Sequence, residues 1–411
     1  MGVWKFNKGE WTESYVFLRL LGRGRIYGAN RDLLQDDTLY LDIKEILRYE
    51  GENIIAFQRE IENGKGIVKV LNNDVNIRIV TSPELDKHAT LLYNEIKRVK
   101  STDRSFTLEE TQSILEHLGL SSPKSNLPQI ALDKYGNKTD IIIKYTTSFD
   151  HAINTNGFSI KSHMGSSATL FNSCTTSTLI YKIQGCTKEK MYQINAIASE
   201  TEIFKTIRDD SELSLEFIGG GSESFEDNMT LCESRMMEIL DVLLRIQIGY
   251  FGNSESNSSK DLVKELIAIN PIKVRNSELY YTSVIKRFLF NSFAGMTASS
   301  QWDGRKNLTG GYIDVSKDGD ILYYRAMSDE VFESYLFEYT FWDRPSRGVQ
   351  KDIAHAKGIA FVSGINPEEI DLKTVIYNNK GKRKSKKGDW GYVYEKDDEY
   401  YIALNFQVRF K

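Results

Sequence analysis

Cysteine is scarce in this sequence, with only Cys174, Cys186 and Cys232 among 411 residues. Their spacings fit neither a zinc cluster nor a framework of paired disulfides, and an odd number of cysteines favours a reducing compartment. We therefore expect three unpaired thiols, either buried or without a role.

Long hydrophobic runs are missing as well. The first ten residues contain no apolar run long enough for a signal peptide. No later stretch approaches the roughly 20 apolar residues needed to span a bilayer. These absences predict a cytoplasmic protein without a membrane segment.

The chain also lacks a strong charge of either sign. Lys and Arg total 53 against 57 for Asp and Glu, which gives a net charge of -4. Any surface that binds nucleic acid must then be a local basic patch on a nearly neutral body. The length of 411 residues suits one large α/β unit or two fused ones.

The N-terminal part of the chain mixes helical and strand patterns. An apolar stripe through Trp11, Tyr15 and Leu18 predicts a buried helix over residues 10–21. Further predicted elements are a short helix at 43–49, strands at 66–70 and 75–80, a helix at 84–100, and a helix opened by a capping box at 107–110. We interpret residues 36–130 as a recognition insert.

A hairpin at residues 139–163 is the central predicted feature. Strand patterns at 141–147 and 158–162 flank the polar turn 150–157. Downstream, the pattern predicts a strand at 178–183, helices at 227–248, 280–293 and 329–337, a strand pair within 311–325 and a closing strand at 400–410. Residues 252–260, rich in Ser and Asn, are predicted to be a loop or an internal boundary.

Asp140 and Lys161 are the candidate catalytic pair. Asp140 stands where one strand begins, while Ser159 and Lys161 are two residues apart on the next strand and so share a face. Phosphodiester hydrolysis needs an oxygen-ligated cation and a positioned water, which an aspartate and a lysine can provide. On its own this spacing is a loose pattern, and a solvated surface pair is the alternative.

Four segments in order resemble the HpaII-type restriction endonucleases: Asn7–Tyr15, Gly157–Ser162, Ala168–Ser173 and Tyr401–Phe410. The resemblance implies an α/β (α+β) protein with a mixed central β-sheet flanked by helices, the PD-(D/E)XK nuclease core with additional DNA-recognition elements. It also implies Mg²⁺-dependent cleavage of double-stranded DNA at a short palindrome, CCGG or a related site. Residues 1–250 would then be the nuclease core, and residues 260–411 an α/β region that binds DNA or completes the core.

The same resemblance implies roles for particular residues. Asp140 takes the place of the metal-binding aspartate and Lys161 that of the water-orienting lysine, and the Ile160 carbonyl is expected to bind the metal. Thr139 stands where many relatives have proline, and Ser159 where an acidic ligand usually lies. The missing carboxylate is expected from the first helix, with Glu13 preferred over Glu10 and with Asp150 a weaker substitute. The alternative for Glu13 is a surface carboxylate favoured by the helix dipole.

DNA contacts are expected at two places. Residues close to the catalytic strand can reach a groove or a phosphate: Ser162, His163, Asn172 and Ser173. A basic run near Trp390 suits salt-sensitive phosphate contacts: Lys382, Arg383, Lys384, Lys386 and Lys387. A structural histidine, a polar loop and a solvated charge run are the respective alternatives. The glycine-rich stretches 22–28 and 219–221 suggest nucleotide binding, but neither follows a strand and opens a helix, so that interpretation is rejected.

Together these features predict a type II restriction endonuclease that yields 5′-phosphate and 3′-hydroxyl ends. A palindromic target is met most simply by a two-fold dimer, and a cognate DNA methyltransferase would be its functional partner. Two alternatives stay open: a nuclease-like DNA-binding module that lost activity with the acid at Ser159, and a nuclease that cuts only methylated DNA.

Overall fold

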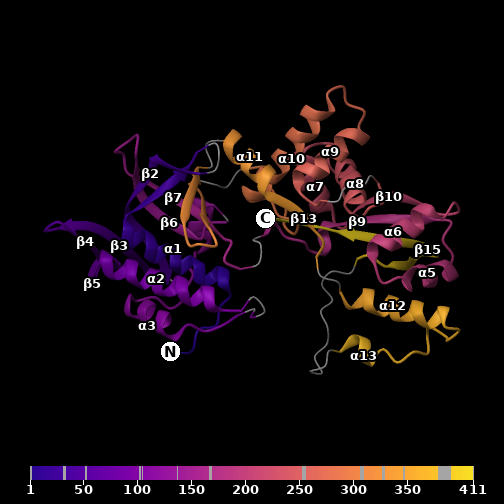
Figure 1. Ribbon diagram of the computed structural model, residues 1–411, viewed down its shortest axis with the longest axis horizontal. Coiled ribbons are helices and arrows are strands. Elements are labelled where there is room, and N and C mark those ends of the chain that lie inside the picture. The colour runs from indigo at the N-terminus through magenta and orange to yellow at the C-terminus, as the bar shows by residue number, and fades with distance from the viewer. Residues whose placement is uncertain are drawn as a thin grey trace. The chain divides into compact units, whose positions relative to one another are not determined.

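The computed structural model describes residues 2–410 except 31–33, 51–52, 101–102, 104, 137, 166–168, 252–255, 306–309, 326–328, 346–347 and 378–389. The chain divides into two compact units (Figure 1). Unit 1 comprises Met1–Ala168 and Lys306–Tyr335, and unit 2 comprises Thr169–Arg305 and Leu336–Lys411. No helix among the described residues is both long and apolar enough to cross a membrane.

Unit 1 is built on a nine-stranded mixed sheet in the order β1-β12-β11-β7-β6-β2-β3-β4-β5. Because β1 pairs with β2 as well as with β12, the first six strands of that order close into a ring, from which β3, β4 and β5 extend. The strands are β1 (Arg25–Ala29), β2 (Gln35–Glu50), β3 (Asn53–Glu62), β4 (Lys65–Asn72), β5 (Val75–Thr81), β6 (Ile141–Thr147), β7 (Asn154–Ser162), β11 (Gly311–Val315) and β12 (Ile321–Arg325). The predicted mixed sheet with flanking helices is confirmed.

The helices of unit 1 are α1 (Lys8–Arg23), α2 (Ser82–Arg98), α3 (Glu109–His117) and α4 (Gln129–Tyr135), and α11 (Asp329–Tyr339) begins in it. Asn7 caps α1 in a capping box with Glu10, and Gly24 ends the helix with a φ of 72°. Ten residues of α1 are buried. The seven apolar ones share one core with Phe158, Ile160 and Ile313 of the ring, whereas α4 packs beside Ile142 on the opposite face of the sheet.

Unit 2 contains a four-stranded sheet in the order β10-β9-β15-β14 and a three-stranded sheet in the order β13-β16-β8. Its strands are β8 (Thr169–Phe171), β9 (Thr178–Gln184), β10 (Ser214–Gly220), β13 (Thr340–Asp343), β14 (Val393–Lys396), β15 (Glu399–Asn405) and β16 (Gln407–Phe410). Its helices are η1 (Thr175–Ser177), α5 (Lys188–Asn195), α6 (Glu200–Asp209), α7 (Glu223–Cys232), α8 (Met236–Gln247), α9 (Ser259–Ile269), α10 (Ser277–Phe293), α12 (Val349–Val362) and α13 (Lys373–Ile376). Stacked rings of Phe288, Trp342 and Phe406 pack in its core.

Several local predictions are wrong. Residues 43–49 belong to strand β2, not to a helix, because they pair with β3 on one side and β6 on the other. The predicted helix at 227–248 is two helices, α7 and α8. The helix near 107–110 begins without a capping box, since Leu108 is its N-cap and makes no side-chain bond.

The compact units also differ from the predicted division at residues 250–260. Strands β11 and β12 return to the ring, so residues 306–335 join the N-terminal part in unit 1. The segment interpreted as a recognition insert within the core, 36–130, supplies β2 to β5 of the same sheet. Its helix α2 packs against α1 and shares the core through Leu85 and Leu92.

Gly24 gives a test of how α1 ends. An added Cβ would overlap the Arg59 guanidinium, whereas at Gly64, where φ is 76°, it would meet nothing within 4 Å. Both positions impose the left-handed strain of about 1 kcal/mol on alanine. We expect Gly24→Ala to cost about 1 kcal/mol more than Gly64→Ala, because Arg59 must also give up its bond to the α1 carbonyls. Urea unfolding measures both variants, and equal losses would contradict this account.

Candidate active site

The β6–β7 hairpin fixes the carboxylate of Asp140. The two strands pair in antiparallel register, with Ile141 opposite Phe158. Oδ2 of Asp140 accepts hydrogen bonds from the Ile160 N–H at 2.6 Å and the Ser159 hydroxyl at 3.1 Å. The hairpin therefore brings together Asp140, Ser159 and Ile160, and Ser159 serves as a donor to the aspartate.

Alternation along β7 separates its side chains onto two faces. Phe158 and Ile160 point into the α1 core, so Ser159 and Lys161 lie on the opposite face. Ser162 follows the core side, where its hydroxyl lies 3.1 Å from that of Thr12 on α1. Ser162 is thus placed away from the face of Lys161, and its predicted DNA contact stays a prediction.

Thr139 and Gly157 shape the start of β6. The Thr139 hydroxyl donates to the Tyr135 carbonyl of α4 at 2.6 Å. A Cβ at Gly157 would overlap that same hydroxyl and would lie 2.8 Å from the Tyr135 carbonyl. Thr139 therefore anchors the segment before Asp140, and the glycine opposite it leaves the space that this requires.

Glu13 approaches this hairpin from α1. Burial, and next the negative charge of Asp140, raise the pKa of Glu13 well above its ordinary value, while the cations Arg48 and Lys124 oppose the rise. Glu10 is engaged elsewhere: it pairs with Lys124 at 2.9 Å and bonds the Asn7 N–H at 3.0 Å. Glu13 therefore lies close enough to Asp140 for the charge of Asp140 to add to the effect of burial on its pKa.

Two cations near Glu13 or Asp140 were not predicted: Arg48, which is buried, and Lys138, which is partly buried. Arg48 donates to the carbonyls of Ser122 and Pro123 at 2.8 and 3.2 Å, and burial lowers its pKa. Lys138 precedes Asp140 by two residues; burial, and then repulsion by Lys161, lower its pKa to about 7. A lysine in a turn looks like any solvated lysine in the sequence, so only its environment reveals it.

His163 and Asp314 form a second polar cluster beside Lys161. Strand β11 runs parallel to β7 with Asp314 opposite Lys161. Nε2 of His163 lies 2.8 Å from Oδ1 of Asp314, which also accepts a bond from the Tyr312 hydroxyl at 3.1 Å. Residues opposite each other in a sheet share a face, so this cluster lies on the same face as Lys161.

Three further sets of site residues were predicted. Asn172 and Ser173 follow β8 and belong to unit 2, with Asn172 exposed. Asp150 is exposed and accepts a local bond from the Ala152 N–H at 2.8 Å. The basic run Lys382, Arg383, Lys384, Lys386 and Lys387 falls outside the described residues.

Comparison with known proteins gives a family match over most of the chain. A family model described as HpaII restriction endonuclease matches residues 7–353. The type II restriction enzyme HpaII of Haemophilus parainfluenzae is 28% identical over 413 residues, which cover 98% of each chain. No solved structure matches the chain.

Glu13 gives a pH-dependent test. Because its folded pKa is raised, ionisation of Glu13 opposes folding progressively as the pH rises above its ordinary pKa of 4.5. Without divalent cations, Glu13→Gln should therefore be more stable than the wild type at pH 8, by about 1 kcal/mol or more. The difference should vanish near pH 4, where the wild-type carboxyl is protonated.

Thermal or urea unfolding between pH 4 and pH 8 measures this difference. Glu10→Gln is the matched control on the same helix: it loses the ion pair with Lys124, so it should be neutral or destabilising at pH 8. If Glu13→Gln is less stable than the wild type at pH 8, the neighbouring cations Arg48 and Lys124 offset the cost of burying the charged glutamate, and the prediction is wrong.

Proposed function

The chain belongs to the HpaII restriction endonuclease family, and from this premise we propose that it cleaves double-stranded DNA at a short palindrome, CCGG or a related sequence, with Mg²⁺. The family and the relative's name establish the type II site-specific endonuclease class. The particular target, the cation and the residues that act are our proposal. The observation that carries it is the Asp140 carboxylate, which hydrogen bonds from Ser159 and Ile160 hold in place. The charge of Asp140 acts on the pKa of Glu13, and Lys161 lies on the adjoining strand.

The donors near Asp140 suit a hard divalent cation. Mg²⁺ binds proteins through one or two carboxylates and keeps several of its waters. Among the described residues, no group of three or more His, Cys, Asp or Glu could hold a metal. A pair of carboxylates, Asp140 and Glu13, together with the Ile160 carbonyl, is the set that we propose. When bound, Mg²⁺ would neutralise charge on the phosphoryl group and lower the pKa of a water.

The repulsion between Glu13 and Asp140 supports this assignment. A partly buried carboxylate whose pKa is raised by desolvation and then by a neighbouring carboxylate gains more from a divalent cation than a solvated one does, because the cation offsets both effects. Ser159 adds no charge and holds Asp140 in place through its hydroxyl. Glu13 then supplies the negative charge that Ser159 cannot.

Lys161 is the residue that we propose to orient the attacking water. The water oxygen bonds to phosphorus, the bond from phosphorus to the 3′ oxygen breaks, and the products are a 5′-phosphate and a 3′-hydroxyl. The proton that the water loses is balanced by the one that the leaving 3′ oxygen gains. His163, held by Asp314, lies on the same face and is proposed to contact a DNA phosphate.

The proposal extends to the fold and the partners. We assign the ring of unit 1 to the PD-(D/E)XK core, with DNA contacts also from Ser162, Asn172, Ser173 and the basic run 382–387. A homodimer would match the symmetry of a palindrome, and a cognate DNA methyltransferase would protect the host site.

Loss of Lys161 is the direct test of the catalytic assignment. Lys161→Ala should reduce the rate of plasmid cleavage in Mg²⁺ by about a hundredfold or more, since general acid–base and water-positioning groups contribute at least this much. Binding of the same DNA should be little changed. End mapping of the wild-type fragments on DNA of known sequence identifies the target.

Lys69→Ala is the matched control: it is also a strand lysine of the same sheet, and it pairs with Glu60 at 2.6 Å. It should cut at the wild-type rate. Full activity of Lys161→Ala would refute the assignment. Tight binding by the wild type without any cut would favour the DNA-binding module, and cutting of methylated DNA alone would favour a methylation-dependent nuclease.

A further inference from the structure

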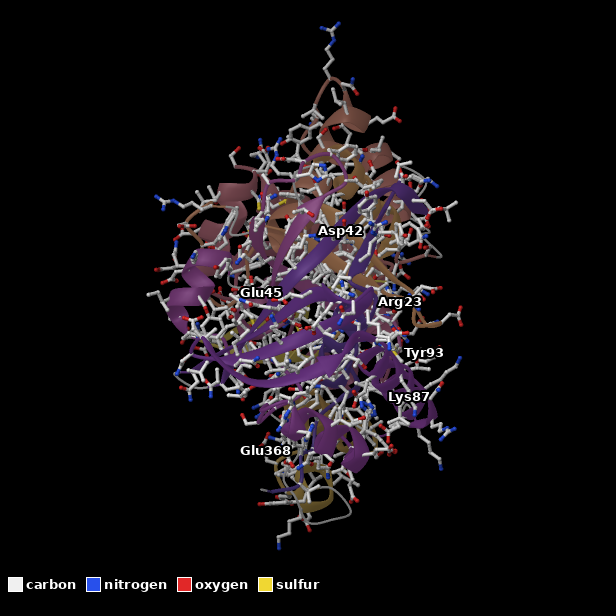
Figure 2. The ribbon with its side chains drawn as sticks, turned by 90° about the vertical axis from the view of Figure 1, so that its left-hand side faces the viewer. Arg23, Asp42, Glu45, Lys87, Tyr93 and Glu368 are labelled. Carbon is white, nitrogen blue, oxygen red and sulfur yellow. The ribbon has the colours of Figure 1, made fainter. Side chains whose placement is uncertain are left out.

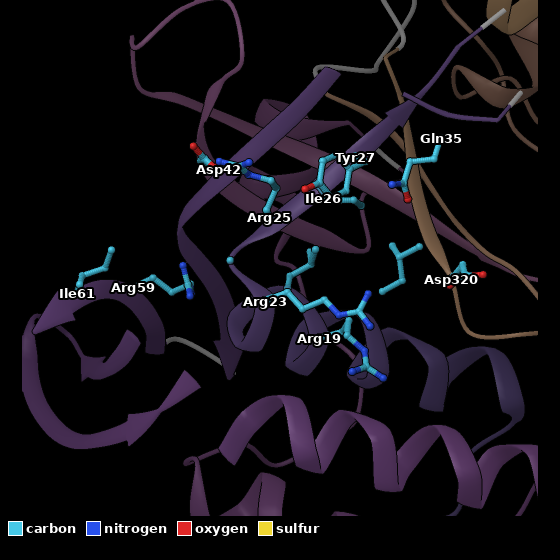
Figure 3. A pocket seen from close by; sticks show the side chains of 13 residues that line it. Arg19, Arg23, Arg25, Ile26, Tyr27, Gln35, Asp42, Arg59, Ile61 and Asp320 are labelled. Atoms are coloured by element: carbon cyan, nitrogen blue, oxygen red, sulfur yellow. Dashed lines mark hydrogen bonds and ion pairs between the residues drawn. The ribbon is translucent and has the colours of Figure 1, made fainter. Parts of the chain in front are cut away.

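A pocket of about 640 Å³ lies at the C-terminal end of α1, entirely within unit 1. Four arginines line it: Arg19 and Arg23 from α1, Arg25 from β1 and Arg59 from β3. Figure 3 shows the α1 arginines below, Arg25 with Asp42 on neighbouring strands, and Arg59 beside Ile61. Glu13 is ten residues before Arg23 on α1, about 15 Å along the helix axis. The pocket is therefore separate from the proposed catalytic residues.

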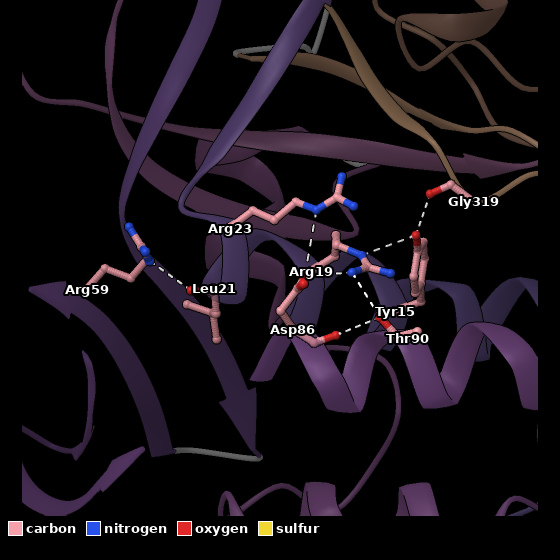
Figure 4. A network of polar contacts seen from close by, with 8 residues as sticks. All are labelled: Tyr15, Arg19, Leu21, Arg23, Arg59, Asp86, Thr90 and Gly319. Atoms are coloured by element: carbon pink, nitrogen blue, oxygen red, sulfur yellow. Dashed lines mark hydrogen bonds and ion pairs between the residues drawn. The ribbon is translucent and has the colours of Figure 1, made fainter. Parts of the chain in front are cut away.

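Two of the arginines each form a close ion pair with a carboxylate of the protein. Arg19 is buried and pairs with Asp86 at 2.6 Å, with a further bond to Thr90 at 3.2 Å (Figure 4). Arg25 pairs with Asp42 at 2.7 Å and lies over the Tyr40 ring. These two guanidinium groups are structural.

The other two have no carboxylate to themselves in the part of the chain that the structure describes. The carboxylate within 4 Å of Arg23 is that of Asp86, at 3.7 Å, which Arg19 already holds more closely. Arg59 donates to the Leu21 carbonyl at 2.7 Å and lies 3.4 Å from the Ser82 hydroxyl. No described carboxylate lies within 4 Å of Arg59, and burial lowers its pKa. A guanidinium placed in this way is a ready partner for an incoming anion.

The position of Arg59 is built into the fold. Its guanidinium occupies the space where a side chain at residue 24 would stand, so only glycine there leaves room for it. The hydrogen bond from Arg59 Nε to the Leu21 carbonyl is explained as capping of α1, because cations are favoured at helix C-termini. It does not explain why Arg23 and Arg25 converge on the same pocket.

The lining indicates the chemistry of a ligand. Four guanidinium groups meet three carboxylates, Asp42 and Asp320 in the lining and Asp86 behind Arg19, in a protein whose net charge is -4. Guanidinium groups bind phosphate through paired hydrogen bonds. A bare phosphate would leave most of 640 Å³ empty, whereas Tyr27 and the apolar Ile26 and Ile61 can contact a sugar or a base.

We infer that this arginine pocket binds the phosphate group of a nucleotide. Residues 23–27 of the glycine-rich stretch 22–28 line it together with residues of other elements. The glycines of that stretch gave no nucleotide motif, because side chains rather than a backbone loop supply the donors. Figure 2 shows Arg23 and Asp42 on the face of unit 1 that is turned to the viewer. The nucleotide can belong to the backbone of a DNA duplex or be free in solution, and only the first case rests on the proposed function.

Binding measured without Mg²⁺ separates the two sources. The probes are a labelled 20-base-pair duplex containing CCGG, at several salt concentrations, and dAMP. The test variant is Arg23→Gln/Arg59→Gln in the full chain. Arg98→Gln is the control, an exposed arginine in the last turn of α2 that is outside the pocket.

If the phosphate is that of DNA, the variant should bind the duplex more weakly. The slope of log affinity against log salt should fall by about 0.9 for each phosphate that the variant no longer binds. If the nucleotide is free, dAMP should raise the Tm of the wild type and of Arg98→Gln but not that of the variant. Unchanged duplex binding together with no effect of dAMP on the wild type would overturn the inference.

A second variant keeps the test valid if loss of Arg59 unfolds the protein. Ile61 lines the pocket and is 79% exposed, so Ile61→Glu places a negative charge there without removing an arginine. Val75→Glu, at a site 64% exposed on β5, is its control. Ile61→Glu alone should lose binding, and equal binding by both would overturn the inference. Failure of Lys161→Ala to abolish cleavage would leave these binding results unaffected.

Discussion

Burial of α1 against the ring of unit 1 is the constraint on which the rest of this structure depends. Its ten buried residues leave one rotation and one depth at which the helix packs. That placement sets Glu13 where burial and the charge of Asp140 raise its pKa, and it sets the Gly24 end of the helix against Arg59. The core packing of α1 thus stabilises two unfavourable arrangements: a carboxylate held close to another carboxylate, and a half-buried arginine with no acid beside it among the described residues.

The elements around the hairpin could be predicted because their patterns are local. The short runs of buried residues in β6 and β7 and the apolar stripe of α1 each lie within a few consecutive residues. Strand β2 could not, since Ile43, Ile46 and Leu47 fit a helical spacing equally well. The closed ring could not be predicted from the sequence either, because the parallel pairing that closes it joins Tyr27 to Leu322, almost 300 positions later.

The site residues likewise include some that the sequence predicts and some that it does not. Asp140, Ser159 and Lys161 follow from strand alternation and family resemblance, and the structure brings the first two into direct contact. Lys138 was missed because the burial of a turn leaves no mark in the sequence, and Asp314 because it reaches Lys161 only through the pairing of β11 with β7. The arginine pocket was missed because its glycines suggested a backbone motif, whereas its donors are side chains from three different elements.

The central claim is that Glu13 and Asp140 together hold the divalent cation. Calorimetric titration of the protein with Mg²⁺ at pH 7.5, in two buffers of different ionisation enthalpy, tests it most directly, because it counts the protons released on binding. The account predicts proton release by the wild type, since a raised pKa leaves Glu13 protonated more often than an ordinary glutamate at the same pH. It also predicts weaker binding with less proton release by Glu13→Gln. Equal affinity and equal proton release in the two proteins would contradict it.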